Sequence, residues 1–138
     1  MNALKIQSKT KQSFKQLGMA LTQFDKALQI PKGLTGLEVD GSIQRFEFCI
    51  ELFWKALKRL LADLGKETEF SRETLQAAYQ GHLIDDEEIW ISMLTDRNKT
   101  SHTYEETLAN EIYSRLTSYS KVMQKNYQSI IKKYDIAS

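Results

Sequence analysis

Apolar residues recur at alternating steps of three and four along much of the chain, which is the spacing of one face of an α-helix. A first pattern predicts a long helix up to Leu28, and Pro31, Gly33 and Gly36 then end it. A second pattern predicts another long helix from about Asp40 to Gly65. The two apolar stripes are Phe14, Leu17, Leu21, Phe24 and Leu28, then Ile43, Phe46, Ile50, Phe53, Leu57, Leu60 and Leu64.

The second half of the chain predicts two short helices and one long one. Ser71 is a candidate N-cap for a short helix that Gly81 closes, and the acidic run 85–88 suits the first turn of the next. Thr103 and Glu106 match a capping box before a last long helix through Tyr134. The sequence contains no alternating strand pattern bounded by turns. It therefore predicts an all-α fold, an antiparallel up-and-down bundle of three long and two short helices in a single domain, 1–138.

The second helix is apolar on more than one face. Phe48 and Leu52 lie away from its stripe, and Trp54 and Leu61 widen the stripe on another side. A helix of this kind is central in its bundle or lies at a subunit interface. In a chain of this length we expect a symmetric homodimer.

Composition narrows the class of protein. The chain has 138 residues, of which 41% are hydrophobic and 27% charged, as expected for a globular domain with its own core. The absence of a secretion signal or a run of about 18 apolar residues predicts a cytoplasmic protein with no membrane segment. The net charge of +1 argues against broad phosphate contact, so any nucleic-acid contact should be local. Cys49, the only cysteine, is expected to be a buried thiol.

Two groups of residues are candidates for a metal site or a carboxylate pair. Cys49, His82 and His102 match no zinc spacing, so we expect no metal and no cofactor. Glu47 and Glu51 share a face of the second helix, where two carboxylates could perform acid–base work or bind a divalent ion. A surface ion-pair ladder with Lys55 is the alternative, and residue spacing favours it.

The polar stretch from Arg97 to Tyr104 is the remaining candidate. A guanidinium group can hold a phosphate through two parallel hydrogen bonds, and histidine exchanges a proton near neutral pH. Lys99 could add a second positive charge. On chemistry alone a catalytic corner and a purely structural one both remain open, and the structural one is the commoner.

The spacing of Arg97, His102 and Tyr104 resembles the signature of HEPN domains. Further segments resemble the small HEPN family named as nucleotidyltransferase substrate-binding proteins, and the resemblance extends from about Ser13 to Lys133. These segments are Gln44–Phe48, Glu51–Lys55, Trp90, Asp96–Asn98 and His102–Tyr104.

The resemblance implies a homodimer that brings two Arg/His corners into one cleft, and a partner, a separate minimal nucleotidyltransferase that acts as antitoxin. The protein would then be a toxin and a metal-independent endoribonuclease that leaves a 2′,3′-cyclic phosphate. His102 would move the protons and Arg97 would stabilise the charge on the phosphate of the RNA substrate.

Other residues take supporting roles under the same resemblance. Asn98 and Lys99 would contact the substrate, although Asn98 could equally be the C-cap of its helix. Tyr104 would be the tyrosine that the partner modifies with adenylate. Glu47 and Glu51 would orient Arg97 or His102. The alternative is a non-catalytic substrate-binding or docking subunit of a separate nucleotidyltransferase.

Overall fold

A computed structural model describes residues 5–33 and 35–136 of the chain. The described residues form helices and turns and contain no strand, which confirms the predicted all-α class. The elements are α1 (Ser8–Leu28), α2 (Leu37–Asp63), α3 (Ser71–Gln80), α4 (Glu87–Lys99), the 3₁₀ turn η1 (Thr100–His102) and α5 (Glu106–Lys133).

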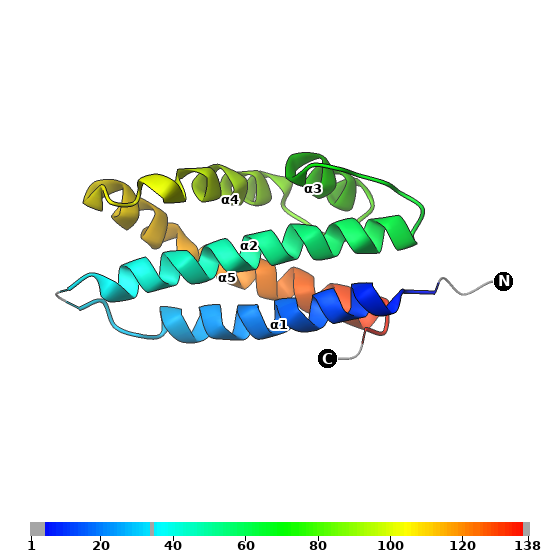
Figure 1. Ribbon diagram of the computed structural model, residues 1–138, viewed down its shortest axis with the longest axis horizontal. Helices are drawn as coiled ribbons and strands as arrows, with labels where there is room; N and C mark the ends of the chain where they lie inside the picture. The colour runs from blue at the N-terminus through cyan, green and yellow to red at the C-terminus, as the bar shows by residue number, and fades with distance from the viewer. Residues whose placement is uncertain (1–4, 34, 137–138) are drawn as a thin grey trace.

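The helices run up and down along the long axis of the molecule, as Figure 1 shows. The long helices α1, α2 and α5 lie side by side, and α3 and α4 follow one another along α2. The α1–α2 connection lies at the same end of the bundle as η1 and the start of α5. That end therefore gathers two connections that are far apart in the sequence.

Helix α2 is central, because it packs against α1, α3, α4 and α5. Its extra apolar residues are largely explained by this position. Leu61 is buried, and Leu52 and Trp54 are partly buried against the core. Phe48 is different: its side chain does not join the core, and the residue is 47% exposed.

The apolar stripes meet in one continuous core. Phe53 of α2 contacts Trp90 of α4 edge to face, with ring centroids 4.7 Å apart. Phe46 stacks on Tyr119 of α5 at 5.4 Å. Cys49 is buried in the same core, and burial raises the pKa of its thiol to about 12, as expected for an unreactive cysteine.

The predicted N-cap at Ser71 was wrong by one residue. Ser71 is the first residue of α3, and Phe70 holds the cap position without a side-chain hydrogen bond. The carboxylate of Glu73 accepts hydrogen bonds from the amides of Glu69 and Phe70 at 2.6 and 3.3 Å, which lowers the pKa of that carboxyl group. The two backbone amides just before α3 are thus hydrogen-bonded by a side chain of the helix itself.

The capping box predicted from Thr103 and Glu106 was also wrong. Helix α5 begins at Glu106 and its cap residue is Glu105, which makes no side-chain cap bond. The Thr103 hydroxyl instead donates to the Thr100 carbonyl oxygen at 2.9 Å. The reason is η1, because Thr103 closes this 3₁₀ turn and cannot also cap α5.

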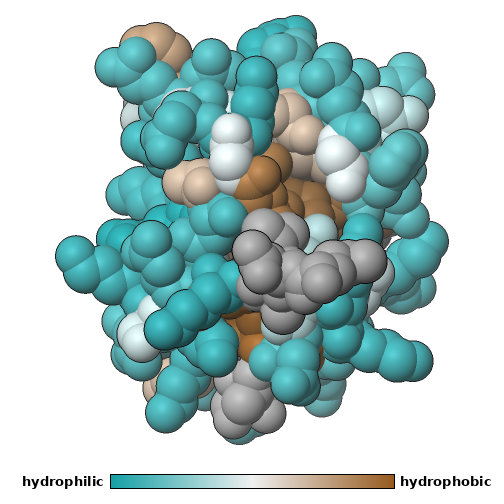
Figure 2. Space-filling view, turned by 90° about the vertical axis from the view of Figure 1, so that its right-hand side faces the viewer, coloured by the Kyte–Doolittle hydropathy of each residue, from teal (hydrophilic) through white to brown (hydrophobic). Residues whose placement is uncertain are grey.

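The opposite end of the bundle, where α1 starts and α5 ends, is largely hydrophilic. Figure 2 views this end and shows polar residues around a smaller apolar area near its middle. Along the described part of the chain, no helix combines the length and the apolar character needed to cross a bilayer.

Gly18 allows a close approach between α1 and α5. The Tyr127 hydroxyl donates to the Phe14 carbonyl oxygen at 3.2 Å, and a Cβ at position 18 would overlap that hydroxyl oxygen. We expect Gly18→Ala to lower the free energy of unfolding by about 1–3 kcal/mol, although alanine favours helix over glycine. Urea unfolding measures the change.

Gly41 of α2 provides the matched control, since a Cβ there would meet no atom within 4 Å. Gly41→Ala should raise the free energy of unfolding by about 0.5–1 kcal/mol through helix propensity alone. Equal effects of the two substitutions would contradict the close packing of Gly18 on Tyr127.

Candidate functional site

Arg97 lies in the last turn of α4 and points to α2, where its guanidinium group pairs with the Glu51 carboxylate. The side chains are partly buried, with 38% of Arg97 and 25% of Glu51 exposed. The other Glu51 oxygen accepts a hydrogen bond from the Trp54 indole at 2.8 Å. Glu51 is thus held from two sides, and it holds the guanidinium of Arg97 in place.

Glu47 and Glu51 differ in their surroundings although they share a helix face. Within residues 5–33 and 35–136, Glu47 makes no ion pair or side-chain hydrogen bond. The ion pair of Glu51 is made with Arg97, and no ladder to Lys55 forms in that part of the chain. Spacing alone favoured the ladder because it cannot reveal a partner on another helix.

Asn98 and Lys99 complete the end of α4, and both are exposed. The Asn98 side-chain oxygen accepts a hydrogen bond from Arg97 Nη1 at 3.3 Å. Its NH₂ group, which can donate two hydrogen bonds, donates none to the residues that the structure describes. A ligand on the α2 side of this turn would therefore meet donors from Arg97 and Asn98, whereas Lys99 lines the cavity between α4 and α5.

His102 and Tyr104 follow directly after α4. The Thr100 hydroxyl donates to the Arg97 carbonyl oxygen at 2.7 Å, so η1 continues from the last turn of α4. His102 is exposed at the end of η1 and its ring lies edge to face with that of Tyr104, with centroids 6.2 Å apart. Tyr104 is 80% exposed. Arg97, His102 and Tyr104 thus lie within one short, solvent-accessible stretch at the end of α4. In the described part of the chain the side chain of Arg97 contacts Glu51 and Asn98, and no hydrogen bond joins it to His102 or Tyr104.

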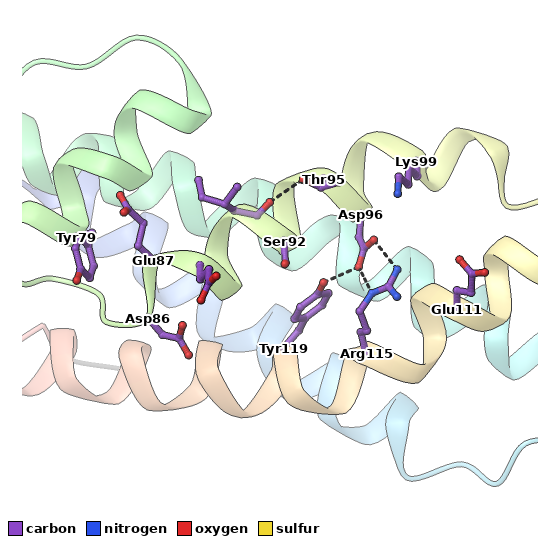
Figure 3. A pocket seen from close by; sticks show the side chains of 12 residues that line it. Tyr79, Asp86, Glu87, Ser92, Thr95, Asp96, Lys99, Glu111, Arg115 and Tyr119 are labelled. Atoms are coloured by element: carbon purple, nitrogen blue, oxygen red, sulfur yellow. Dashed lines mark hydrogen bonds and ion pairs between the residues drawn. The ribbon is translucent and has the colours of Figure 1, made fainter.

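Sequence reasoning missed a buried network on the other side of α4. Asp96 is 3% exposed and accepts hydrogen bonds from Arg115 Nε and Nη2 at 2.7 and 2.8 Å and from the Tyr119 hydroxyl at 2.5 Å. Figure 3 shows these three side chains converging between α4 and α5. Burial and the Asp96 carboxylate raise the pKa of Tyr119, and the same carboxylate raises the pKa of Arg115.

Asp96 and Arg97 are consecutive residues of α4. Asp96 binds side chains of α5 and Arg97 binds a side chain of α2, so the last turn of α4 is fixed to both helices. The sequence offered only a weak signal for the buried network. Asp96 belongs to the segments that carry the family resemblance, but Arg115 lies 19 positions away and Tyr119 fitted the core stripe equally well.

A cavity of about 860 Å³ lies between α4 and α5 beside this network. Its lining includes five carboxylates and only two cations, Lys99 and Arg115, a balance that disfavours a phosphate inside it. The described residues contain no group of three or more side chains placed to hold a metal ion. The carboxylates lining the cavity are Asp86, Glu87, Glu88, Asp96 and Glu111.

The fold is that of a HEPN-type helical domain. The chain belongs to the family described as nucleotidyltransferase substrate binding protein like, whose model matches residues 12–132. This is the group that the motifs around Arg97 and Glu51 resemble.

Two relatives support the assignment. The chain is 33% identical over 86 residues to a protein of Haemophilus influenzae described as the probable ribonuclease HepT, and this match covers 59% of each chain. A crystal structure of a protein from Thermus thermophilus superposes with a TM-score of 0.77 at 31% identity, over 83% of this chain and 98% of the other. The first relative is matched over little more than half its length.

Because the pKa of Tyr119 is raised in the folded protein, the free energy of unfolding should fall as the pH rises in the alkaline range. A phenol whose pKa is higher in the folded state contributes its full stabilisation below about pH 10 and loses it as the pH rises further. We expect Tyr119→Phe to cost about 1.5–3 kcal/mol at pH 7, because it removes a hydrogen bond to a charged group, and to flatten the decline above pH 10. Chemical unfolding between pH 7 and 11 measures both.

Tyr79, which is 42% exposed, supplies the control. Tyr79→Phe should leave both the stability at pH 7 and the alkaline decline as in the parent. If Tyr119→Phe behaved like Tyr79→Phe, the buried network would not stabilise the fold.

Proposed function

We propose that this protein is a metal-independent endoribonuclease of the HEPN type and the toxin of a pair whose antitoxin is a minimal nucleotidyltransferase. The observation that carries the proposal is the corner at the end of α4. There, Glu51 holds the Arg97 guanidinium while part of it stays exposed, and the exposed His102 follows one short turn later. Membership of the family and the similarity to a probable ribonuclease support it.

The chemistry requires a proton acceptor, a proton donor and a positive charge. His102 would take the proton from a ribose 2′-hydroxyl, whose oxygen attacks the neighbouring phosphorus, and the 5′-oxygen would leave with a proton from a second imidazole. Arg97 would stabilise the added negative charge on the five-coordinate phosphate. The product carries a 2′,3′-cyclic phosphate. Asn98 and Lys99 would orient the phosphate through the donors described above.

A homodimer would supply the second imidazole. Phe48 is 47% exposed on α2, one turn before Glu51, and an aromatic side chain left outside a packed core is typical of an interface. A twofold axis near Phe48 would bring the Arg97 and His102 side chains of two protomers toward one cleft. Each protomer could then provide one of the two proton transfers.

Tyr104 would be the point of control by the nucleotidyltransferase. With 80% of its surface exposed, its hydroxyl is accessible to another enzyme. Its oxygen would attack the α-phosphate of a nucleoside triphosphate, displace pyrophosphate and lose its proton. The attached nucleotide adds volume and negative charge beside His102, and both oppose the approach of RNA.

Cleavage of labelled single-stranded RNA in excess EDTA tests the proposed function. The parent should release fragments with 2′,3′-cyclic ends, and His102→Ala and Arg97→Ala should each lower the rate by about 10²-fold or more, because each removes a group that acts on the transition state. His82→Asn is the matched control, since His82 lies on the α3–α4 connection and asparagine tolerates its positive φ of 61°.

Two results would count against the nuclease. Cleavage that EDTA abolishes would contradict a metal-independent mechanism. A dimeric parent that is as inert as both variants, yet binds a nucleotidyltransferase, would instead support the non-catalytic docking subunit that the family description also permits.

Glu51 is proposed as a positioning residue that acts through Arg97. Glu51→Gln keeps an acceptor for the Trp54 indole but removes the charge that holds the guanidinium. We expect the cleavage rate to fall about tenfold in the parent and to change little in an Arg97→Ala background, because the two residues act as one unit. Glu47→Gln, one turn earlier, should have a smaller effect. Additive losses from Glu51→Gln and Arg97→Ala would contradict the coupling.

A further inference from the structure

A second cavity lies beside Tyr104 at the end of the bundle. It has a volume of about 450 Å³ and lies between the α1–α2 connection and the start of α5, two segments that Figure 1 places at this end. Its volume is in the range of small-ligand sites. Its polar and aromatic lining includes Lys32, Thr35, Asp40, Tyr104, Glu106 and Asn110.

The α1–α2 connection is shaped by two local features. Gly36 has a φ of 76°, a left-handed conformation that glycine adopts without strain. The Gly33 amide donates to the Glu38 carboxylate at 2.6 Å, which ties the connection to the first turn of α2. The wall of the cavity on this side is therefore held by hydrogen bonds rather than by apolar packing.

Lys32 bridges the connection to α5. Its Nζ donates to the Asn110 side-chain oxygen at 2.9 Å and lies 5.9 Å from the centre of the Tyr113 ring. An ammonium group has three donors, so two remain for another partner, and Lys32 is exposed. This places a positive charge at a defined position on the cavity wall.

Tyr104 supplies an aromatic face to the same cavity. Its ring is 80% exposed, and apart from the edge contact with His102 no aromatic ring of the described chain packs on it. An exposed aromatic ring next to a lysine is the usual combination for single-stranded RNA, whose bases stack on the ring while the cation contacts the backbone.

The carboxylates of Asp40 and Glu106 determine which part of a nucleotide can enter. Two negative charges on the lining oppose a phosphate inside the cavity but not an uncharged base. Carboxylate oxygens accept hydrogen bonds from the exocyclic amino groups of cytosine, adenine and guanine. Uracil presents the O4 oxygen in place of this amino group, and its single N3–H donor lies between two carbonyl oxygens, so a carboxylate approaching that edge also meets an acceptor.

We propose that this cavity is the subsite for the base of a nucleotide next to the scissile phosphate, with the base stacked on Tyr104 and its amino group on Asp40 or Glu106. The backbone phosphate of that nucleotide would stay outside the cavity, on the solvent-exposed side of Lys32. The inference rests on the proposed function, since it gives that nuclease its base preference. It also gives Tyr104 a second role, because a nucleotide attached to its hydroxyl would occupy the position of the substrate base.

Binding of fluorescent single-stranded oligo(C) and oligo(U) to the full-length His102→Ala protein tests the subsite without cleavage. The two bases have the same ring size and differ only at position 4, an amino group against a carbonyl oxygen, and at N3, an acceptor against an N–H donor, so they form a matched pair. We expect oligo(C) to bind about tenfold more tightly than oligo(U). Combined Asp40→Asn and Glu106→Gln substitutions should abolish the difference.

Variants of Tyr104 and Lys32 test the other two contacts. Tyr104→Ala should weaken binding of oligo(C) about tenfold, and Tyr104→Trp should retain it because an aromatic ring is kept. Lys32→Met should reduce the slope of log affinity against log salt by about 0.7, the value for one contact to a single strand. Lys11→Met is the control, since Lys11 is exposed on α1 near the opposite end of the bundle.

The outcomes separate this inference from the proposed function. If the parent cleaves RNA but Tyr104→Ala, Lys32→Met and the double carboxylate variant all bind oligo(C) and oligo(U) as it does, the subsite is overturned and the nuclease stands. If the parent binds with the expected base preference yet never cleaves, the subsite stands and the nuclease fails. A parent that neither binds nor cleaves single-stranded RNA overturns both.

Discussion

The last turn of α4 is fixed between two other helices, and the candidate site depends on this. Asp96 and Arg97 are neighbours in the sequence, but successive residues of a helix project about 100° apart. Asp96 therefore reaches Arg115 and Tyr119 on α5, whereas Arg97 reaches Glu51 on α2. Removing Arg115, the ionic partner of Asp96, would leave an unpaired charge in the interior, which costs about 3–5 kcal/mol. Small rotations of this turn are thus opposed from both sides.

This arrangement explains how the corner combines a fixed guanidinium with an accessible imidazole. The backbone of α4 is determined up to Lys99, and η1 then carries His102 out to the surface. A catalytic arginine gains from being held in place before substrate arrives, because no reorganisation is then needed during the reaction. A histidine that must exchange protons with RNA and solvent gains from exposure.

Charge is distributed around the corner in a way that suits local rather than broad contact with nucleic acid. The net charge is +1, and carboxylates outnumber cations in the lining of the cavity between α4 and α5. At the end of the bundle, Lys32 and Tyr104 lie beside the carboxylates of Asp40 and Glu106, so cations and carboxylates are mixed there. Any contact with a phosphate at that end would be made by single cations and not by a broad positive surface.

The sequence by itself determined the helices and the chemical character of the corner. Apolar steps of three and four require one buried face per helix, so α1, α2 and α5 could be predicted from residue spacing alone. The caps at Ser71 and Thr103 failed, because a cap depends on a single backbone position: α3 starts one residue earlier than expected, and η1 takes up Thr103. The tertiary structure alone decided the partners of Arg97 and Asp96. Ion pairs between helices depend on how those helices pack, and spacing along one helix carries no record of what lies across from it.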